Sequence, residues 1–514
     1  MMARTVKLYL YLSLTALLLS ACQPMALTKL PAATPQPTTP SFMRTACLYQ
    51  IPPDEDVECG FLLTREVHND PTSRIIRLHV VIFKSASAQP RAEPLVILNG
   101  GPGSADAPVV GSLLYSDMGL AWRTSHDVIL IDQRGTNFSI PSLQCAPASS
   151  DPATTLPTFA MQTQLEYANL QSCYSDLVAR EINLSAYHLM ESAADIHDLR
   201  VALGYDQIIL YGYSYGSLLA MSIMRDYPAD VHSAILDSVL PLGIDLTCER
   251  LSCLQSGLDA LFAACAADAP CHAAYPSLEA DFWTTIDRLR TDPVPMALTF
   301  AGQDYTVVVD DQLIIRYVFL LLQQSAIRQL PAAIEAVARG YYVDLARSWI
   351  SYVASPEPSI KRGEKSAEGL YFSTMCSYLD TFAADSPSNT SADENAMPAA
   401  EFHPALVEYG GAAFAPCAFW DVAPLDVSFI APLPASDIPT LVLAGKFDPG
   451  LAPYLSHALL PNLRQNSYYE LPVSHGVVFA PCGLYLTYAF LQDATQPPDT
   501  ACIEGMAVEW VLPE

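Results

Sequence analysis

The feature that most constrains this chain is the stretch YGYSYGS at residues 211–217. It follows the apolar run QIIL and precedes LLAMSIMRDY, whose residues favour a helix. Ser214 has a glycine two positions before it and another two positions after it. This spacing is typical of a sharp strand-to-helix turn that lifts a serine hydroxyl above a sheet, because side chains at both glycine positions would collide with neighbouring backbone. A serine in a turn is more often inert, but the strand before it and the helix after it predict that Ser214 is a nucleophile.

Strand-like and helix-like segments alternate along most of the chain. Residues 191–204 carry apolar side chains at helical spacing and end at Gly204, as a helix does. Such alternation predicts an α/β protein with a mostly parallel central sheet and helices on both faces, and the turn at Ser214 indicates an α/β-hydrolase fold. The expected strands are RIIRLHVVIF (74–83), PLVILNG (94–100), DVILIDQRG (127–135), QIILYGY (207–213), SAILDSV (233–239), PTLVLAG (439–445) and SYYELP (467–472).

A long interruption separates SAILDSV from PTLVLAG. About 200 residues of mostly helical pattern lie between these two runs, and structureless connections of that length are rare. We therefore expect a large, mainly helical cap domain inserted late in the sheet. The predicted organisation is a first part of the core at residues 46–240, the cap at 241–436 and the C-terminal part of the core at 437–514.

A nucleophilic serine needs a base to remove its proton and a carboxylate to orient that base. In the expected fold the carboxylate follows a late strand and the histidine follows the last one. Asp448 comes directly after PTLVLAG, and among the ten histidines His475 alone follows the last expected strand. Asp380 and Asp421 compete with Asp448, but both lie in the expected insertion. The predicted catalytic triad is Ser214, Asp448 and His475.

Glycines also follow the strand-like run PLVILNG. The sequence NGGPGSA leaves backbone N–H groups without side-chain cover, so that they can approach a negatively charged oxygen. We expect the N–H groups of Gly101 and Tyr215 to form an oxyanion hole, with Gly100 as the alternative to Gly101. A tight turn with positive φ would use the same glycines. A phosphate-binding loop would require Lys followed by Ser or Thr, which the sequence lacks here.

Residues 1–21 have the pattern of an export signal. Two basic residues precede the apolar stretch LYLYLSLTALLL, and LSAC adds small residues and Cys22. The pattern resembles a bacterial lipoprotein signal, which implies cleavage before Cys22 and lipidation of that residue. An ordinary signal peptide is the alternative. Residues 22–45 are rich in Pro and Thr and predict an extended tether, so we expect an exported cell-envelope lipoprotein on the periplasmic or extracellular side.

The cysteines are consistent with export. Of the 13 cysteines, 12 remain after Cys22, and an even number in an oxidising compartment predicts up to six disulfides. A metal site is disfavoured, because no Cys-x-x-Cys pair and no histidine cluster occur. The expected local pairs are Cys47–Cys59, Cys145–Cys173, Cys376–Cys417 and Cys482–Cys502. Spacing leaves the pairing of Cys248, Cys253, Cys265 and Cys271 open.

The charge of the chain narrows the classes of partner. Asp and Glu number 54 against 26 Lys and Arg, which gives a formal net charge of −28. This charge repels nucleic acid and anionic membrane surfaces, so we expect no nucleic acid partner and membrane contact only through the lipid on Cys22. The sequence contains no metal or dinucleotide fingerprint, and we expect no cofactor. The oligomeric state is left open.

Several motifs occur in a fixed order: NGGPGSA, DQRGTNFSIPSLQC, GYSYGS, AGKFDPG and SHG, with CAFW at 417–420. As a set they resemble the secreted α/β-hydrolase peptidases of the proline iminopeptidase and tripeptidyl aminopeptidase type over residues 45–505. Residues 437–514 resemble the C-terminal part of the tripeptidyl aminopeptidases. The chain has Asn99, Asn137 and Ser474 where family members usually have His, Gly and Gly. These departures lie outside the triad and bear on substrate preference.

The resemblance implies a serine exopeptidase that releases short peptides or single residues from peptide N-termini through an acyl-enzyme on Ser214. Binding a free α-amino group requires a carboxylate. Glu191 and Asp195 are candidates, although acids at a helix start are favoured by the helix dipole anyway. Asp132 and Arg134 are expected to form a buried ion pair. A carboxylesterase or lipase would use the same triad on another acyl substrate, and a catalytically inactive binding protein would typically lack one of its members.

Overall fold

The computed structural model describes residues 40–513, except the segments 105–115, 147–157, 355–365 and 386–401 and the single positions 245, 325 and 430. The expected signal at residues 1–21 and the expected lipidation site Cys22 lie outside the described residues. Most of the expected tether lies outside them as well.

The end of the expected tether is part of the fold. Strand β1 (Ser41–Thr45) pairs antiparallel with β2 (Val57–Arg65), so the prediction of an extended tether is wrong for these five residues. The physical reason is a side-chain contact. Phe42 packs against the core beside Gly60, where an added Cβ atom would lie 2.6 Å from the Phe42 ring.

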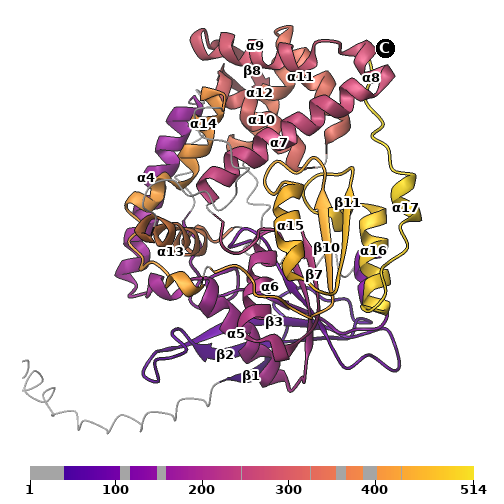
Figure 1. The fold of residues 1–514 in the computed structure, drawn as a ribbon. Coiled ribbons are helices and arrows are strands. Elements are labelled where there is room, and N and C mark those ends of the chain that lie inside the picture. Colours follow the sequence, from indigo (N-terminus) through magenta and orange to yellow (C-terminus); the bar gives the residue numbers. More distant parts are fainter. Residues whose placement is uncertain are drawn as a thin grey trace, which may run out of the picture. The chain divides into compact units, whose positions relative to one another are not determined.

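The core of the protein is a sheet of nine strands (Figure 1). The antiparallel pairs are β1 with β2, β2 with β3, and β3 with β5, and all other neighbours are parallel. The expected mostly parallel sheet is therefore confirmed. In spatial order the strands are β1, β2, β3 (Ile75–Phe83), β5 (Val128–Ile131), β4 (Leu95–Leu98), β6 (Ile208–Tyr213), β7 (Val231–Asp237), β10 (Thr440–Gly445) and β11 (Asn466–Leu471).

Both faces of this sheet are covered by helices. Side chains alternate along β6, with Ile208 and Leu210 in one apolar cluster and Ile209 and Tyr211 in the other. This alternation is what a strand buried on both faces requires. The first face packs against α5 (Leu189–Leu203), α6 (Tyr215–Asp226) and α15 (Pro453–Leu459). The second face packs against α3 (Asp117–Trp122), α16 (Pro481–Gln492) and α17 (Ala501–Glu504).

The residues between β7 and β10 form a mainly helical cap (Figure 1). A β-hairpin inside it, β8 (Val294–Phe300) and β9 (Gln303–Val309), was not expected from the sequence. The limits 241–436 stay a prediction. The cap helices are α7 (Leu246–Ala267), α8 (Ala269–Ala274), α9 (Leu278–Thr291), α10 (Asp311–Gln323), α11 (Leu330–Ala338), α12 (Val343–Ala354), α13 (Glu368–Asp385) and α14 (Pro404–Gly411).

Two apolar clusters hold these added elements. The larger one joins the hairpin to most cap helices and is separate from the clusters that flank the sheet. The smaller one packs α13 against α4 (Phe159–Ala179) around the fully buried Trp420. Helix α4 precedes the cap in the sequence. The helical part of the molecule therefore contains residues that come before β7 in the chain as well as residues that come after it.

Five disulfides join described cysteines. Four of them are the pairs expected from spacing, and Cys265–Cys271 is a further pair from the cluster that spacing left open. The sulfur of buried Cys253 lies 3.3 Å from the Tyr454 hydroxyl, and the side chain of Cys248 lies outside the described part. In the described residues, every helix is too short or too polar to cross a membrane.

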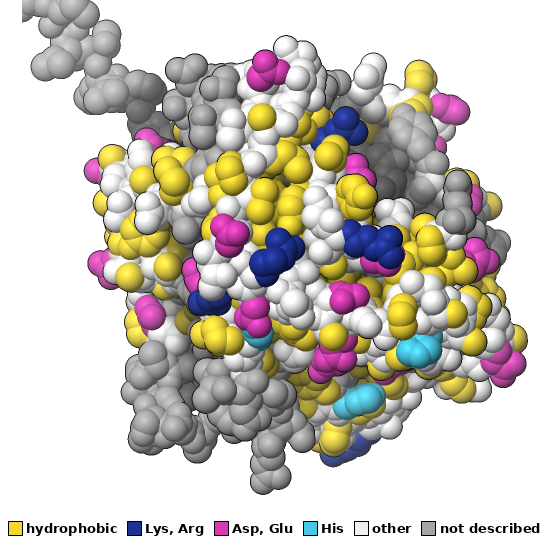
Figure 2. All heavy atoms as spheres, turned by 90° about the horizontal axis from the view of Figure 1, so that it is seen from above, with side chains coloured by type: hydrophobic (Ala, Val, Ile, Leu, Met, Phe, Trp, Pro, Cys, Tyr) yellow, Lys and Arg dark blue, Asp and Glu magenta, His cyan; other side chains and the backbone are white. Residues whose placement is uncertain are grey.

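The surface charge is dispersed on the face shown in Figure 2. Lys and Arg side chains stand apart from one another there, among acidic and apolar side chains. A nucleic-acid interface would instead gather cations into a stripe or patch. The described residues of this face form no such patch.

Replacing Cys376 and Cys417 by serine should lower the free energy of unfolding by about 2–4 kcal/mol. This disulfide spans 41 residues and joins α13 to η5 (Ala412–Ala418), so its loss increases the conformational freedom of the unfolded chain. Denaturant unfolding of the oxidised proteins measures the difference. The double variant Cys265→Ser/Cys271→Ser, whose bridge spans 6 residues, is the control and should lose less. Equal losses would show that loop closure is not the cause.

Candidate active site

The turn between β6 and α6 holds Ser214 in a strained backbone conformation, with φ 58° and ψ −125°. The glycines around it are required by close contacts. A Cβ atom at Gly212 would lie 2.4 Å from the carbonyl oxygen of Gly216, and one at Gly216 would lie 1.8 Å from the carbonyl oxygen of Leu98. No L side chain fits at such distances, so the sequence around Ser214 reflects the geometry of the turn.

Two further side chains of the predicted triad meet beyond the ends of neighbouring strands. Asp448 follows β10 and His475 follows β11, and the His475 Nδ1 atom lies 2.7 Å from the Asp448 Oδ2 atom. The other carboxylate oxygen of Asp448 accepts N–H groups of Gly450 and Leu451, both at 2.9 Å. The turn after β10 therefore fixes the carboxylate and leaves one oxygen for the histidine.

A third carboxylate, Asp237 at the end of β7, holds the chain that follows His475. Its two oxygens accept the N–H groups of Val477 and Val478 at 2.9 and 3.0 Å, and the Tyr211 hydroxyl donates to it at 3.0 Å. Sequence reasoning did not single out Asp237. The signal was present, because SAILDSV ends an expected parallel strand with a carboxylate next to the predicted nucleophile strand.

The electrostatics of the site favour a charged imidazolium. Burial lowers the pKa of His475, but the charge of Asp448, its hydrogen bond and the charge of Asp237 outweigh burial and raise that pKa above its ordinary value. Burial raises the pKa of Asp237, which its N–H donors and Tyr211 partly offset. The Tyr213 ring lies 5.1 Å from the His475 ring and covers one side of it.

Ser214 and His475 line one pocket of about 150 Å³. The structure thus brings the predicted nucleophile and base to the same cavity, with the acid bound behind the base. Core and cap both form the wall. The core contributes Gly101, Ser214, Tyr215, Leu240, Gly450, Leu451, Leu455 and His475. The cap contributes Arg250, Phe319, Gln323, Tyr371, Met375 and Phe414.

The residues expected to form the oxyanion hole lie at this pocket. Gly101, with φ 109°, and Tyr215, the first residue of α6, both line it. Gly100 is in contact with the nucleophile, because a Cβ atom there would lie 2.9 Å from the Cβ atom of Ser214. Which N–H group binds an oxyanion stays a prediction.

The expected ion pair between Asp132 and Arg134 does not form. Arg134 donates from Nε and Nη2 to the two carboxylate oxygens of Asp195 at 2.7 and 2.8 Å. Asp132 lies 3.1 Å from the Nδ1 atom of His79 and also accepts from Asn137. Both side chains are buried, but their partners come from different elements, α5 for Arg134 and β3 for Asp132.

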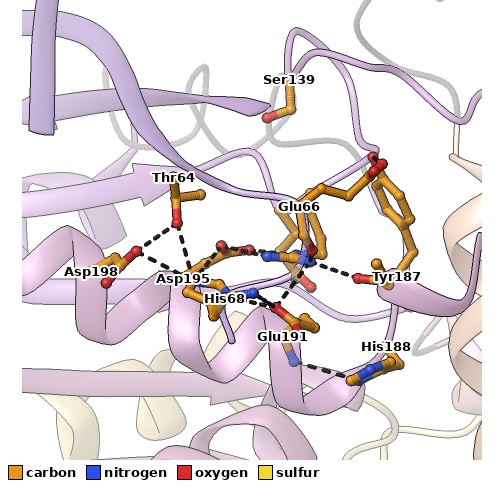
Figure 3. A network of polar contacts seen from close by, with 12 residues as sticks. Thr64, Glu66, His68, Ser139, Tyr187, His188, Glu191, Asp195 and Asp198 are labelled. Carbon is orange, nitrogen blue, oxygen red and sulfur yellow. Dashed lines mark hydrogen bonds and ion pairs between the residues drawn. The ribbon is translucent and has the colours of Figure 1, made fainter. Parts of the chain in front are cut away.

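Glu191 and Asp195, the candidates for binding substrate, belong to the polar network shown in Figure 3. Asp195 is occupied by Arg134, and Glu191 bonds to His68 and lies 3.5 Å from Arg134. Neither carboxylate lines the pocket that contains Ser214. Their contacts connect α5 with the loop after β2 and with the segment after β5. A role for them in binding substrate stays a prediction.

Two histidines in this network have opposite pKa shifts. Burial lowers the pKa of His68, but bonds to Asp198 and Glu191 and the charge of Asp195 raise it to about 9. Burial and the charge of Arg134 lower the pKa of His188 to about 4. His188 accepts backbone N–H groups at the start of α5 through Nδ1, which requires a neutral ring.

His68 should make the stability of the fold depend on pH above neutrality. Since its folded-state pKa of about 9 exceeds the ordinary histidine value of about 6.5, its contribution is complete below about pH 6.5 and disappears as the pH rises through 9. About 3 kcal/mol of unfolding free energy should be lost over this interval. Denaturant unfolding across that pH range measures the loss, which His68→Gln should largely abolish. His197→Gln, which removes another acid-paired histidine of α5, should keep the wild-type dependence. The same dependence in His68→Gln would contradict the assignment.

The predicted reaction at Ser214 should slow as the pH falls. The midpoint of this decrease should lie above about pH 6.5, the ordinary pKa of histidine. His475 must be neutral to accept a proton, and its pKa is raised, so lowering the pH through that pKa removes the base. The pH profile of kcat/KM, or of labelling by a fluorophosphonate, measures the midpoint. Asp237→Asn removes a nearby negative charge and should move the midpoint to lower pH. An unchanged midpoint would mean that Asp237 does not act on His475.

Comparisons with known proteins agree with this arrangement. Residues 93–256 match the family described as alpha/beta hydrolase fold. A protein named "Probable proline iminopeptidase" from Streptomyces coelicolor is 28% identical over 158 residues, which cover 31% of this chain and 36% of that protein. "Serine protease Hip1" from Mycobacterium tuberculosis is 24% identical over 200 residues, which cover 36% of each chain. The chain thus matches about a third of the length of these curated relatives.

Solved structures cover more of the chain. The proline iminopeptidase of Mycobacterium smegmatis covers 82% of this chain and 96% of its own, at 16% identity and a TM-score of 0.38. The nine-stranded sheet, the turn at Ser214 and the match over residues 93–256 establish that this chain has the α/β-hydrolase fold.

Proposed function

We propose that this protein is a serine hydrolase that forms an acyl-enzyme on Ser214. One observation carries the proposal: Ser214, in a strained turn, lines the same pocket as His475, whose Nδ1 atom is bound to Asp448. With the Nδ1 proton donated to Asp448, Nε2 is left to accept the Ser214 proton while Oγ attacks a carbonyl carbon. His475 then gives this proton to the leaving group, and water releases the acyl group in a second step.

The negative charge that develops on the carbonyl oxygen needs donors. We assign this role to the N–H groups of Gly101 and Tyr215, with Gly100 as the alternative to Gly101. Both assigned residues line the pocket, and Tyr215 begins a helix of 12 residues whose first N–H groups lack partners within the helix. This position supports the stabilisation of an oxyanion beside the nucleophile.

A peptidase acting on short substrates is the preferred form of this hydrolase. The names of the two curated relatives support peptidase chemistry. The small pocket, whose wall includes Phe319 and Tyr371 of the cap, supports a preference for short substrates, since a volume of about 150 Å³ holds roughly one side chain. We propose an exopeptidase that releases single residues or short peptides from peptide N-termini.

A carboxylesterase is the second candidate, and one feature of the pocket favours it. No carboxylate occurs among the residues that line the pocket in the described part of the chain. An aminopeptidase needs such a group to bind the α-ammonium of its substrate. An ester with a small, uncharged acyl group has no ammonium group and needs no carboxylate in the pocket.

The cellular location of the protein is proposed from its disulfides and its N-terminal sequence. Five disulfides indicate an extracytoplasmic protein, because disulfides persist in oxidising compartments. Anchoring to the cell envelope through lipid on Cys22, after removal of residues 1–21, is the proposal that follows from the sequence of the export signal.

Ser214→Ala should abolish turnover and keep the fold, because it removes the nucleophile and only one oxygen atom. The substrates are prolyl and tripeptidyl nitroanilides, each with a free and with an acetylated N-terminus, beside short-chain nitrophenyl esters. We expect kcat/KM to fall by about 10³-fold or more in the variant. Cleavage of the free anilides alone would support an aminopeptidase, and turnover of esters alone would support the carboxylesterase.

Controls separate loss of chemistry from loss of fold. A fluorophosphonate should label the wild type at Ser214, and His475→Ala should greatly reduce this labelling, because the base no longer activates the hydroxyl. Ser175→Ala changes an exposed serine of α4, outside the pocket, and should keep labelling. Labelling of another serine would contradict the assignment. A folded wild type with neither labelling nor turnover would indicate an inactive binding protein.

A further inference from the structure

Besides His475, one basic side chain lines the pocket that contains Ser214. Arg250, on cap helix α7, lines the same cavity as Ser214 and His475. The other cap residues in the wall are three aromatic residues, a methionine and Gln323. A cation in a wall of this composition is not explained by the catalytic chemistry, which uses the triad and backbone N–H groups.

The contacts of Arg250 leave its charge unmatched. Its guanidinium carbon lies 6.0 Å from the centre of the Phe414 ring, and its buried Nε atom has no hydrogen-bond partner. Within the described part of the chain, no hydrogen bond or ion pair joins Arg250 to an acidic side chain. Arg250 is half-buried, and its Nε–H is shielded from water without a partner. Leaving such a donor unpaired is costly, and the contact with an aromatic ring compensates only part of the cost.

The protein matches the fully buried Arg134 differently. Two carboxylates of α5, Asp195 and Glu191, lie beside it. Acids are abundant, since the chain carries 54 of them against 26 basic residues. The lack of one beside Arg250 therefore leaves a place for an anion that arrives with the substrate.

We propose that Arg250 is a specificity-determining residue that binds a carboxylate of the substrate while Ser214 attacks. A guanidinium presents two parallel N–H groups that match the two oxygens of a carboxylate, so the substrate class is a small acyl compound or short peptide with a carboxylate near the scissile bond. This inference rests on the proposed serine hydrolase activity and names its substrates.

The carboxylate has two chemical sources. It can belong to an acidic side chain in the acyl part of the substrate. It can also be the free C-terminus of a short peptide, in which case the leaving part carries it. In both cases the contact would orient the carbonyl carbon toward Ser214 Oγ. Both sources fit the small pocket and the exclusion of long chains by the cap.

Paired substrates that differ only in this charge test the proposal. The first pair is the glutamyl and glutaminyl nitroanilide, which places the carboxylate in the acyl part. The second pair is trialanine and its C-terminal amide, followed by chromatography of the products, which places the carboxylate in the leaving part. We expect kcat/KM to favour the charged member of at least one pair by about 10- to 100-fold, as charged hydrogen bonds are worth about 1.5–3 kcal/mol.

Variants assign this preference to Arg250. Arg250→Met should abolish the preference, and Arg250→Lys should keep part of it. Arg339→Met, which changes an exposed arginine of the cap outside the pocket, is the matched control and should keep the full preference. No preference in the wild type for either pair would overturn the proposal, and so would an equal loss for both members in Arg250→Met.

Separate measurements report the specificity of Arg250 and the activity of Ser214. Fluorophosphonate labelling and turnover of uncharged esters report the triad without involving a carboxylate. A wild type that labels and cleaves neutral substrates but ignores the charge is an active hydrolase without the proposed specificity. A wild type that does neither has no hydrolase activity, and the inference falls with it. An Arg250→Met variant that labels normally is folded, so its kinetics can be interpreted.

Discussion

The backbone at Ser214 is held in a conformation that L residues avoid, at a cost of about 1–3 kcal/mol. The strain persists because β4, β6 and α6 cross too closely for any alternative, with Gly216 in contact with the carbonyl oxygen of Leu98. The same crossing places the loop after β4 beside the nucleophile, where Gly100 contacts Ser214. The tight turn thus exposes the hydroxyl and brings the candidate oxyanion donors to it. Substituting either glycine of the turn would disturb both features together.

Asp448, the acid of the predicted triad, follows core strand β10 but lies next to the cap. Phe447, next to Asp448, is part of the main apolar cluster of the cap. Helix α7 approaches the same turn so closely that a Cβ atom at Gly257 would lie 3.1 Å from the Cα atom of Pro449. The orientation of Asp448, and through it of His475, therefore depends on how the cap packs. The cap therefore contributes both to the wall of the pocket and to the surroundings of Asp448.

Sequence reasoning found the parts of this protein that depend on local pattern. The seven expected strands of the sheet are present. The order in which Ser214, Asp448 and His475 follow strands could be read because β6 and β10 are apolar runs and two tyrosines mark β11. Strand β2 was missed, because polar residues and Gly60 interrupt VECGFLLTR, and so was the hairpin, which is half exposed. The partner of Arg134 was assigned wrongly. Ion pairs between distant elements have no local signal, and the network of α5 depends on where the loop after β2 lies.

Net charge and local charge act differently at this pocket. A chain with a net charge of −28 repels an anionic substrate at a distance, but salt screens this repulsion beyond about 8 Å at physiological ionic strength. Within the pocket, where aromatic and aliphatic side chains form much of the wall, the field of Arg250 is screened less than in water. The pocket therefore attracts a carboxylate that the surface as a whole disfavours. The negative surface slows the approach of an anionic substrate, whereas the pocket stabilises the substrate once it is bound. Higher salt should therefore change the association rate constant more than it changes the ratio of kcat/KM between charged and neutral substrates.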